Sequence, residues 1–101
     1  MVIYRDDNPE AARTICLSLS DGSIYMSEQD CGPLVERWTG RQSAERFLSR
    51  IDAEHLKRIL KISSDSEMIE SLARSFGTNH GFDDFVHFLN RYEIPFETGS
   101  Y

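Results

Sequence analysis

Residues 13–27 read RTICLSLSDGSIYMS, and this stretch decides the fold because two runs with strand alternation meet at Asp21-Gly22. An Asp-Gly pair is a preferred two-residue loop of a β-hairpin. Such a loop places Ser20 opposite Ser23 and unites one apolar face from both runs, which consists of Ile15, Leu17, Leu19, Ile24 and Met26. A slip of one residue would mix this face with the polar one, so the pattern predicts a hairpin of defined register.

The composition is that of one globular domain. The chain has 101 residues, 40% of them hydrophobic and 28% charged, and we expect residues 1–101 to form a single domain. We expect neither a secretory signal nor a membrane contact, because no stretch has the required basic and apolar pattern or length. Cys16 and Cys31 match neither a CxxC pair nor a zinc knuckle, which favours a reduced, cytoplasmic protein, with a disulfide between them left open.

The charge of the chain is negative and unevenly distributed. The formal charge of −6 repels nucleic-acid phosphates and favours basic protein partners. Residues 37–61 form a basic island with seven Lys and Arg against three acids, whereas residues 1–36 and 62–101 are acidic. These blocks either neutralise one another over the folded surface or form separate charged faces, and the sequence is compatible with both.

The segments before and after the hairpin carry clear boundary signals. Residues 2–5 are predicted to form an edge strand, and Asp7-Asn8-Pro9 is predicted to form the turn that follows it. Residues 33–38 fit a short helix that begins at Pro33 and contains Trp38, the only tryptophan. Trp38 is expected either to pack in the core or to contact a partner.

Two C-terminal helices are predicted. Ser64 and Glu67 form a capping-box pattern before a helix over 65–76, and Gly77 suits a left-handed cap. A last helix over 82–92 has acids in its first turn, where the helix dipole favours anions. Residues 94–96 can form only an edge strand or an extended segment because of Pro95, and residues 98–101 are predicted to fray.

The central segment, residues 43–62, has two competing interpretations. Its apolar residues fit helical spacing over the whole length, which predicts one long amphipathic helix. Alternatively, residues 45–51 form a strand, and Asp52 caps a fresh helix that begins there.

Three short stretches carry a resemblance: YRDDNP at 4–9, QDCGP at 29–33 and YEIPFE at 92–97. They resemble a group of short acidic bacterial proteins of unassigned function. In size, charge and layout the chain is also similar to the small immunity proteins that neutralise toxin domains in bacterial competition systems. The first resemblance implies that residues 45–51 are a strand followed by a helix from Asp52. We therefore expect an α+β fold, an antiparallel sheet of three to four strands with about three C-terminal helices on one face.

No pattern in the sequence predicts catalysis, a metal or a cofactor. His55, His80 and His87 lack the spacing of a zinc site. His87 and Asp83 lie one helical turn apart and could act as an acid-base pair, but a solvated polar face explains them more simply. Nucleophile elbows, phosphate-binding glycine loops and dinucleotide fingerprints are missing. The chain is therefore not expected to be an enzyme.

The acidic residues are the candidate partner-binding surface. A nuclease toxin holds an electropositive cleft, so an acidic inhibitor gains rapid association through electrostatic steering. We expect an immunity or antitoxin protein that neutralises a basic toxin domain, with a nuclease as the target class; the alternative is a regulatory adaptor that binds through Trp38 and the basic island. The predicted contact residues are Asp6, Asp7, Glu10, Glu28, Asp30, Trp38, Asp83 and Asp84.

Overall fold

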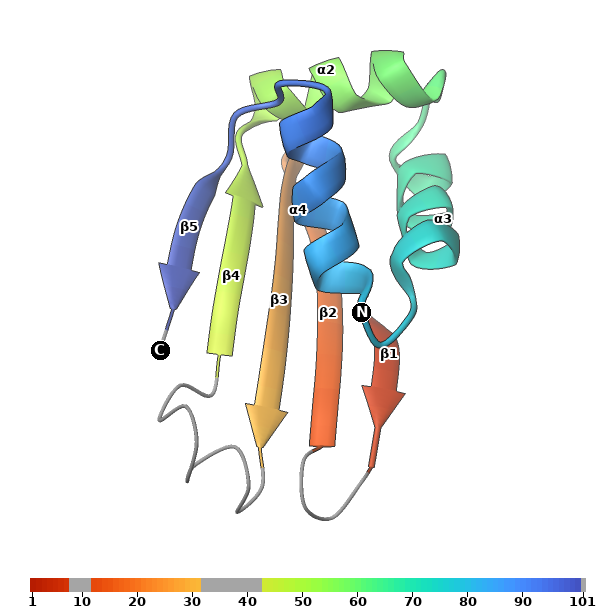
Figure 1. Cartoon of the computed structure of the whole chain (residues 1–101). Helices are drawn as coiled ribbons and strands as arrows, with labels where there is room; N and C mark the ends of the chain where they lie inside the picture. Colours follow the sequence, from red (N-terminus) through yellow and green to blue (C-terminus); the bar gives the residue numbers. More distant parts are fainter. Residues whose placement is uncertain (8–11, 32–42, 101) are drawn as a thin grey trace.

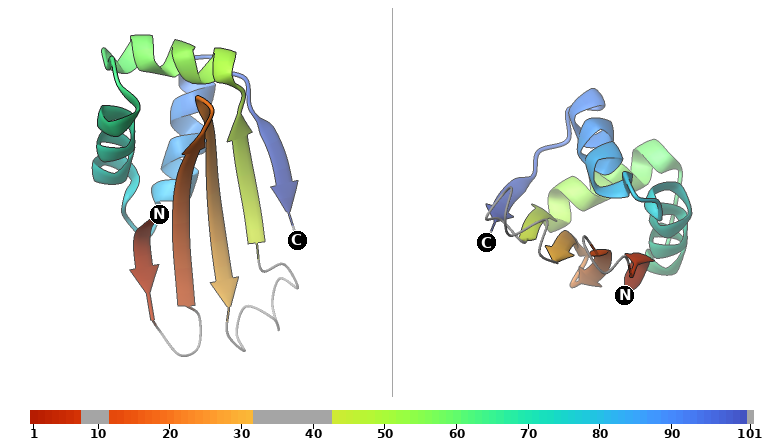
Figure 2. Two further views of the ribbon diagram at one scale, coloured as in Figure 1. Left: turned by 180° about the vertical axis from the view of Figure 1, so that it is seen from behind. Right: turned by 60° about the horizontal axis from the view of Figure 1, so that its bottom comes forward.

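The computed structural model describes residues 1–7, 12–31 and 43–100 (Figure 1). Its sheet has five antiparallel strands in the order β1-β2-β3-β4-β5, and three helices cover one face of that sheet (Figure 2). This confirms the α+β class, with five strands instead of three to four. The elements are β1 (Val2–Asp6), β2 (Ala12–Ser20), β3 (Ser23–Cys31), β4 (Ser43–Leu48), α2 (Arg50–Leu60), α3 (Asp65–Phe76), α4 (Gly81–Arg91) and β5 (Glu97–Ser100).

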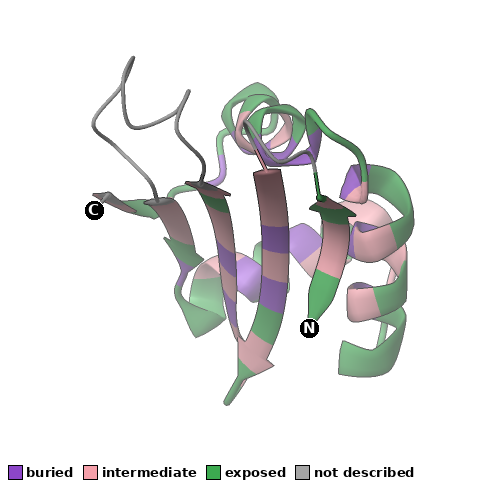
Figure 3. Ribbon diagram, turned by 90° about the horizontal axis from the view of Figure 1, so that it is seen from below, coloured by how far each residue is buried: buried purple, intermediate pink, exposed green. Residues whose placement is uncertain are grey.

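The central hairpin forms in the predicted register. Ser20 lies opposite Ser23, and Leu17 lies opposite Met26. The loop residues Asp21 and Gly22 have φ angles of 51° and 82°, which is the backbone geometry that a tight two-residue hairpin loop requires. Alternation of side chains along the strands then turns one face of β2 and β3 inward, as the stripes of buried residues in Figure 3 show.

The core lies between this sheet face and the helices. Four residues of the predicted hairpin face, Ile15, Leu17, Ile24 and Met26, are fully buried, and Leu19 packs at the edge. The helices contribute the buried side chains Leu56, Met68, Leu72, Phe76, Phe82, Phe85 and Leu89. The rings of Phe76 and Phe85 meet edge to face, with their centroids 5.2 Å apart, so α3 and α4 are held together as well as to the sheet.

The central segment divides into a strand and a helix, so the single long helix is wrong. The strand ends at Leu48, opposite Ile24, and the helix begins at Arg50. Ser49 is the N-cap, since its Oγ accepts a hydrogen bond from the backbone N–H of Asp52 at 3.4 Å and donates one to the Asp52 carboxylate at 2.9 Å. The prediction of Asp52 as the cap is therefore wrong by one turn, because strand pairing ends three residues earlier than expected.

The helix α3 has its predicted bounds, but its C-terminus differs from the prediction. Ser64 Oγ accepts a hydrogen bond from the backbone N–H of Glu67 at 3.2 Å, as the capping box requires. Gly77 has a φ of −81°, so the predicted left-handed cap is wrong. A Cβ on Gly77 would lie 2.7 Å from the carbonyl oxygen of Ile3. The glycine therefore permits the end of α3 to pack closely on β1.

Of the two predictions for residues 94–96, the edge strand is wrong, and the segment without regular secondary structure remains. Ile94 is buried in the core instead of lying in a strand, and Pro95 follows it. The strand begins at Glu97 and pairs with β4, with Glu97 opposite Phe47 and Ser100 opposite Ala44. The predicted fraying is thus wrong for residues 98–100.

Candidate functional site

The helix-facing side of the sheet changes from apolar to charged along β2 and β3. Arg13 precedes the buried Ile15 by two residues and therefore shares its face, and Glu28 lies opposite Ile15. The first turn of α4 is the part of that helix nearest to this end of the sheet (Figure 1). We call this group the charged cluster, and it consists of Arg13, Glu28, Asp30, Arg46 and Asp83.

Arg13 is the centre of the charged cluster. Its Nε and Nη2 donate to the two carboxylate oxygens of Asp30 at 2.8 and 2.9 Å, and Nη2 lies 3.5 Å from Glu28 Oε1. Nη1 also donates to the backbone carbonyl of Asn79 at 2.9 Å. The hydrogen bond to Asp30 raises the pKa of Arg13. One guanidinium thereby joins two strands to the loop that leads into α4.

Glu28 is held in an unfavourable environment for an anion. Its side chain is only 14% exposed, and its Oε2 has no hydrogen-bond partner within the described ranges. Burial raises the pKa of Glu28, and the nearby Arg13 opposes that effect. A further positive charge at Oε2 would stabilise the ionised carboxylate.

Arg46 also points to the helix-facing side. Its guanidinium lies 5.0 Å from the centroid of the Phe82 ring and 6.0 Å from that of Phe96, and Nη1 donates to the backbone carbonyl of Glu45 at 2.7 Å. Stacking on aromatic rings explains how a central strand accommodates an arginine on its inner face.

Asp83 and Asp84 occupy the first turn of α4, where both are exposed and the helix dipole favours anions. Asp83 lies close enough to Arg13 and Glu28 to raise the pKa of both groups. Asp6 lies directly opposite Arg13 in the pairing of β1 with β2. Carboxylates from β1, β3 and α4 therefore converge at one end of the molecule.

The predicted contact residues are thus only partly brought together. The residues that gather at this end are Asp6, Glu28, Asp30, Asp83 and Asp84. Asp7 is exposed and pairs with its neighbour Arg5 at 3.1 Å. Glu10 and Trp38 lie outside the described residues.

Arg13 was missed as a site residue, although the sequence held a signal for it. The predicted hairpin register, extended by seven residues from Ser20, places Arg13 opposite Asp30, as observed. By contrast, the acids that open α3 form a separate group, since Asp65 pairs with Lys57 of α2 at 2.6 Å. The hydrogen bond to Asp65 raises the pKa of Lys57.

The histidines and cysteines do not assemble a reactive site in the part of the chain that the structure describes. His55, His80 and His87 are exposed, and three or more potential metal ligands do not gather anywhere in residues 1–7, 12–31 and 43–100. Cys16 is a free cysteine, and Cys31 pairs with Ala12 further along β2. The helices in these ranges are too short or too polar to span a membrane.

Comparisons of the chain with protein-family models, with curated proteins and with solved structures found no match.

Proposed function

We propose that the chain is a non-catalytic, cytoplasmic immunity or antitoxin protein that binds and neutralises a basic toxin domain, with a nuclease as the target class. The observation that supports this proposal is the convergence of Asp6, Glu28, Asp30, Asp83 and Asp84 at one end of the molecule. The formal charge of −6 adds long-range attraction for a basic partner.

The arrangement of the charged cluster suits a cationic partner. Arg13 holds the carboxylates of Asp30 and Glu28 in place, which lowers the entropy lost when a partner binds them. Asp83 and Asp84 are exposed at the start of α4, so a lysine or arginine of the partner can reach their carboxylates. A nuclease cleft lined with such side chains is complementary to this end of the molecule.

The adaptor alternative receives less support. It requires the basic island to present one continuous contact face, but Arg46 stacks between Phe82 and Phe96 on the inner side of the sheet. Arg50 and Arg58 are exposed on α2. The basic island among the described residues is therefore divided between the interior and the surface.

The test begins with tagged chain as bait in lysate of the source cell, washed at low and at high salt. We expect a basic protein to be retained at low salt and partly released at high salt, because salt screens the exposed charges. The retained protein is then expressed alone and together with the chain. Growth arrest that the chain relieves would support the proposal, whereas a harmless, neutral or acidic partner would contradict it.

A matched pair of variants locates the contact. Asp83→Asn with Asp84→Asn removes two charges from α4, and Glu67→Gln with Glu70→Gln removes two from α3. We expect the first pair to weaken binding by about tenfold or more, and the second by less than about threefold. Equal losses would show that only the net charge matters.

A further inference from the structure

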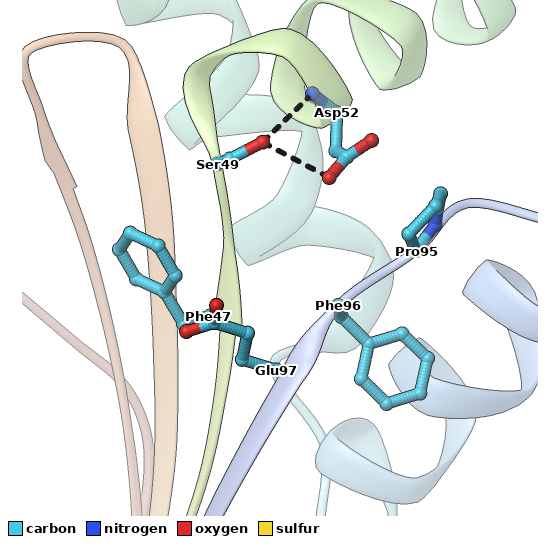
Figure 4. Close-up of a pocket in the computed structure, with 6 residues that line it drawn as sticks. All are labelled: Phe47, Ser49, Asp52, Pro95, Phe96 and Glu97. Carbon is cyan, nitrogen blue, oxygen red and sulfur yellow. Dashed lines mark hydrogen bonds between the residues drawn. The ribbon is translucent and has the colours of Figure 1, made fainter.

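A groove lies at the corner where the end of β4, the start of α2 and the segment leading into β5 meet (Figure 4). Its volume is about 260 Å³, and it is lined by Phe47, Ser49, Asp52, Pro95, Phe96 and Glu97. Phe47 lies near the end of β4, whereas Glu28 of the charged cluster pairs with Ala44 near its start, and Arg46 of that cluster approaches the groove through the Phe96 ring.

Two carboxylates of the groove are available to a cation. The Glu97 carboxylate forms no hydrogen bond or ion pair with the described residues, although its backbone belongs to the β4–β5 pair. Asp52 forms no ion pair with them either, and it accepts a hydrogen bond from Ser49 Oγ through Oδ2 only. The six residues that line the groove therefore include two carboxylates and no basic side chain.

The groove also has an exposed aromatic wall. Phe47 is 37% exposed, and side-chain alternation turns it away from the face of Arg46 and the fully buried Leu48, which is the face that the helices cover. It is the direct neighbour of Glu97 across the β4–β5 pair, and Figure 4 shows the Glu97 carboxylate reaching toward the Phe47 side of β4. Phe96 lies on the other side of β5, where Arg46 already approaches its ring. Phe47 is thus the ring that remains open to a ligand.

We propose that this groove receives an arginine side chain of the partner protein, an inference that depends on the proposed function and adds a second anchor to it. A planar guanidinium can stack on the Phe47 ring while it donates hydrogen bonds to Glu97 and Asp52. Charge complementarity selects this occupant, because an apolar side chain would leave both carboxylates without a partner.

The first experiment uses the chain alone. Isotope-labelled protein is titrated with N-acetyl-arginine N-methylamide and, as the uncharged control, with the corresponding citrulline derivative, and NMR shifts are followed. We expect saturable shifts at the Phe47 ring and at the amides of Asp52 and Glu97 with the arginine probe only. Equal shifts with citrulline, or arginine shifts confined to α4, would overturn the inference.

Variants then test whether the NMR shifts arise from binding of the arginine probe in the groove. Glu97→Gln and Phe47→Leu should each weaken binding of the arginine probe by about threefold or more. Glu70→Gln, which removes an exposed carboxylate from α3, should leave binding unchanged. Retained binding in Glu97→Gln and Phe47→Leu would overturn the inference.

The affinity of the variants for the captured partner tests this inference and the proposed function separately. Loss of affinity in both Asp83→Asn/Asp84→Asn and Glu97→Gln would support both proposals. Loss in the α4 variant alone would leave the proposed function intact and overturn the groove inference. Binding of the arginine probe without any basic partner would overturn the proposed function and leave a guanidinium-binding groove.

Discussion

Arg13 and Asp30 form a two-point ion pair across the β2–β3 hairpin, with N–O distances of 2.8 and 2.9 Å, although they are seventeen residues apart in the chain. The pair is mostly buried, with side chains 27% and 23% exposed. It therefore differs from the exposed pair of Arg5 with Asp7, which are 68% and 80% exposed. Partial burial and bidentate geometry make the first pair the stronger one.

Replacement of Arg13 should consequently destabilise the fold. Arg13→Gln leaves Asp30 and Glu28 without their cation and removes the hydrogen bond to the Asn79 carbonyl. We expect a loss of about 1–3 kcal/mol in the free energy of unfolding, measured by urea denaturation. The matched variant Arg5→Gln should cost less than about 0.5 kcal/mol. Similar losses in the two variants would contradict the importance of burial.

Glu28 should make stability depend on pH in a defined direction. Because burial raises its pKa in the folded chain, its ionised form is less stable there than in the unfolded chain. This penalty is present at neutral pH and disappears as the pH falls through the raised pKa toward the ordinary value. Glu28→Gln should therefore be more stable than the parent near about pH 7, and the difference should shrink toward about pH 4.

Urea unfolding of the two proteins at several pH values measures this difference directly. Because every other carboxylate is shared by the parent and the variant, the difference isolates Glu28. A difference that stays constant, or that grows as the pH falls, would show that burial does not govern this carboxylate.

The hairpin and α3 were predictable because their signals are local. Alternation around Asp21-Gly22 and the pattern Ser64 to Glu67 each specify a backbone geometry within a few residues. By contrast, β5 is short and its residues are polar, so it forms a strand only because β4 provides a partner. The start of α2 depends in the same way on where β4 stops pairing with β3.

In the candidate site too, some features were predictable from the local sequence and others depend on tertiary contacts. Each acidic residue was visible in the sequence, but the meeting of Asp6, Glu28 and Asp83 depends on how the sheet and α4 are connected. The groove around Phe47 was not foreseen, because its walls come from β4, α2 and the approach to β5. Contacts between such distant segments leave no spacing pattern in the chain.

Ser49, not Asp52, should control the start of α2. Ser49→Ala removes the oxygen that accepts the Asp52 backbone N–H, so we expect a loss of about 1 kcal/mol in the free energy of unfolding. Asp52→Asn keeps that hydrogen bond and removes one charge from the first turn, which should cost less, about 0.3–1 kcal/mol. Urea denaturation measures the loss of stability in both variants. A larger loss in Asp52→Asn than in Ser49→Ala would indicate that Asp52 is the N-cap residue.

Gly77 should be required for close packing, not for a left-handed backbone. A Cβ at this position would lie 2.4 Å from the carbonyl oxygen of Ala73 and 2.7 Å from that of Ile3. Gly77→Ala should therefore lower the free energy of unfolding by about 2 kcal/mol or more and shift the NMR signals of β1. Gly99→Ala is the control, because the atoms nearest to its Cβ would belong to the Glu45 side chain, with Oε2 at 3.0 Å, and not to the backbone.

A second substitution separates the two explanations for Gly77. Asparagine tolerates the left-handed region better than alanine does, so Gly77→Asn would be the milder change at a left-handed cap. With φ at −81° and two carbonyl oxygens in the way, we expect Gly77→Asn to destabilise the chain at least as much as Gly77→Ala. Recovery of stability in the asparagine variant would instead indicate that the end of α3 adopts the left-handed cap in solution.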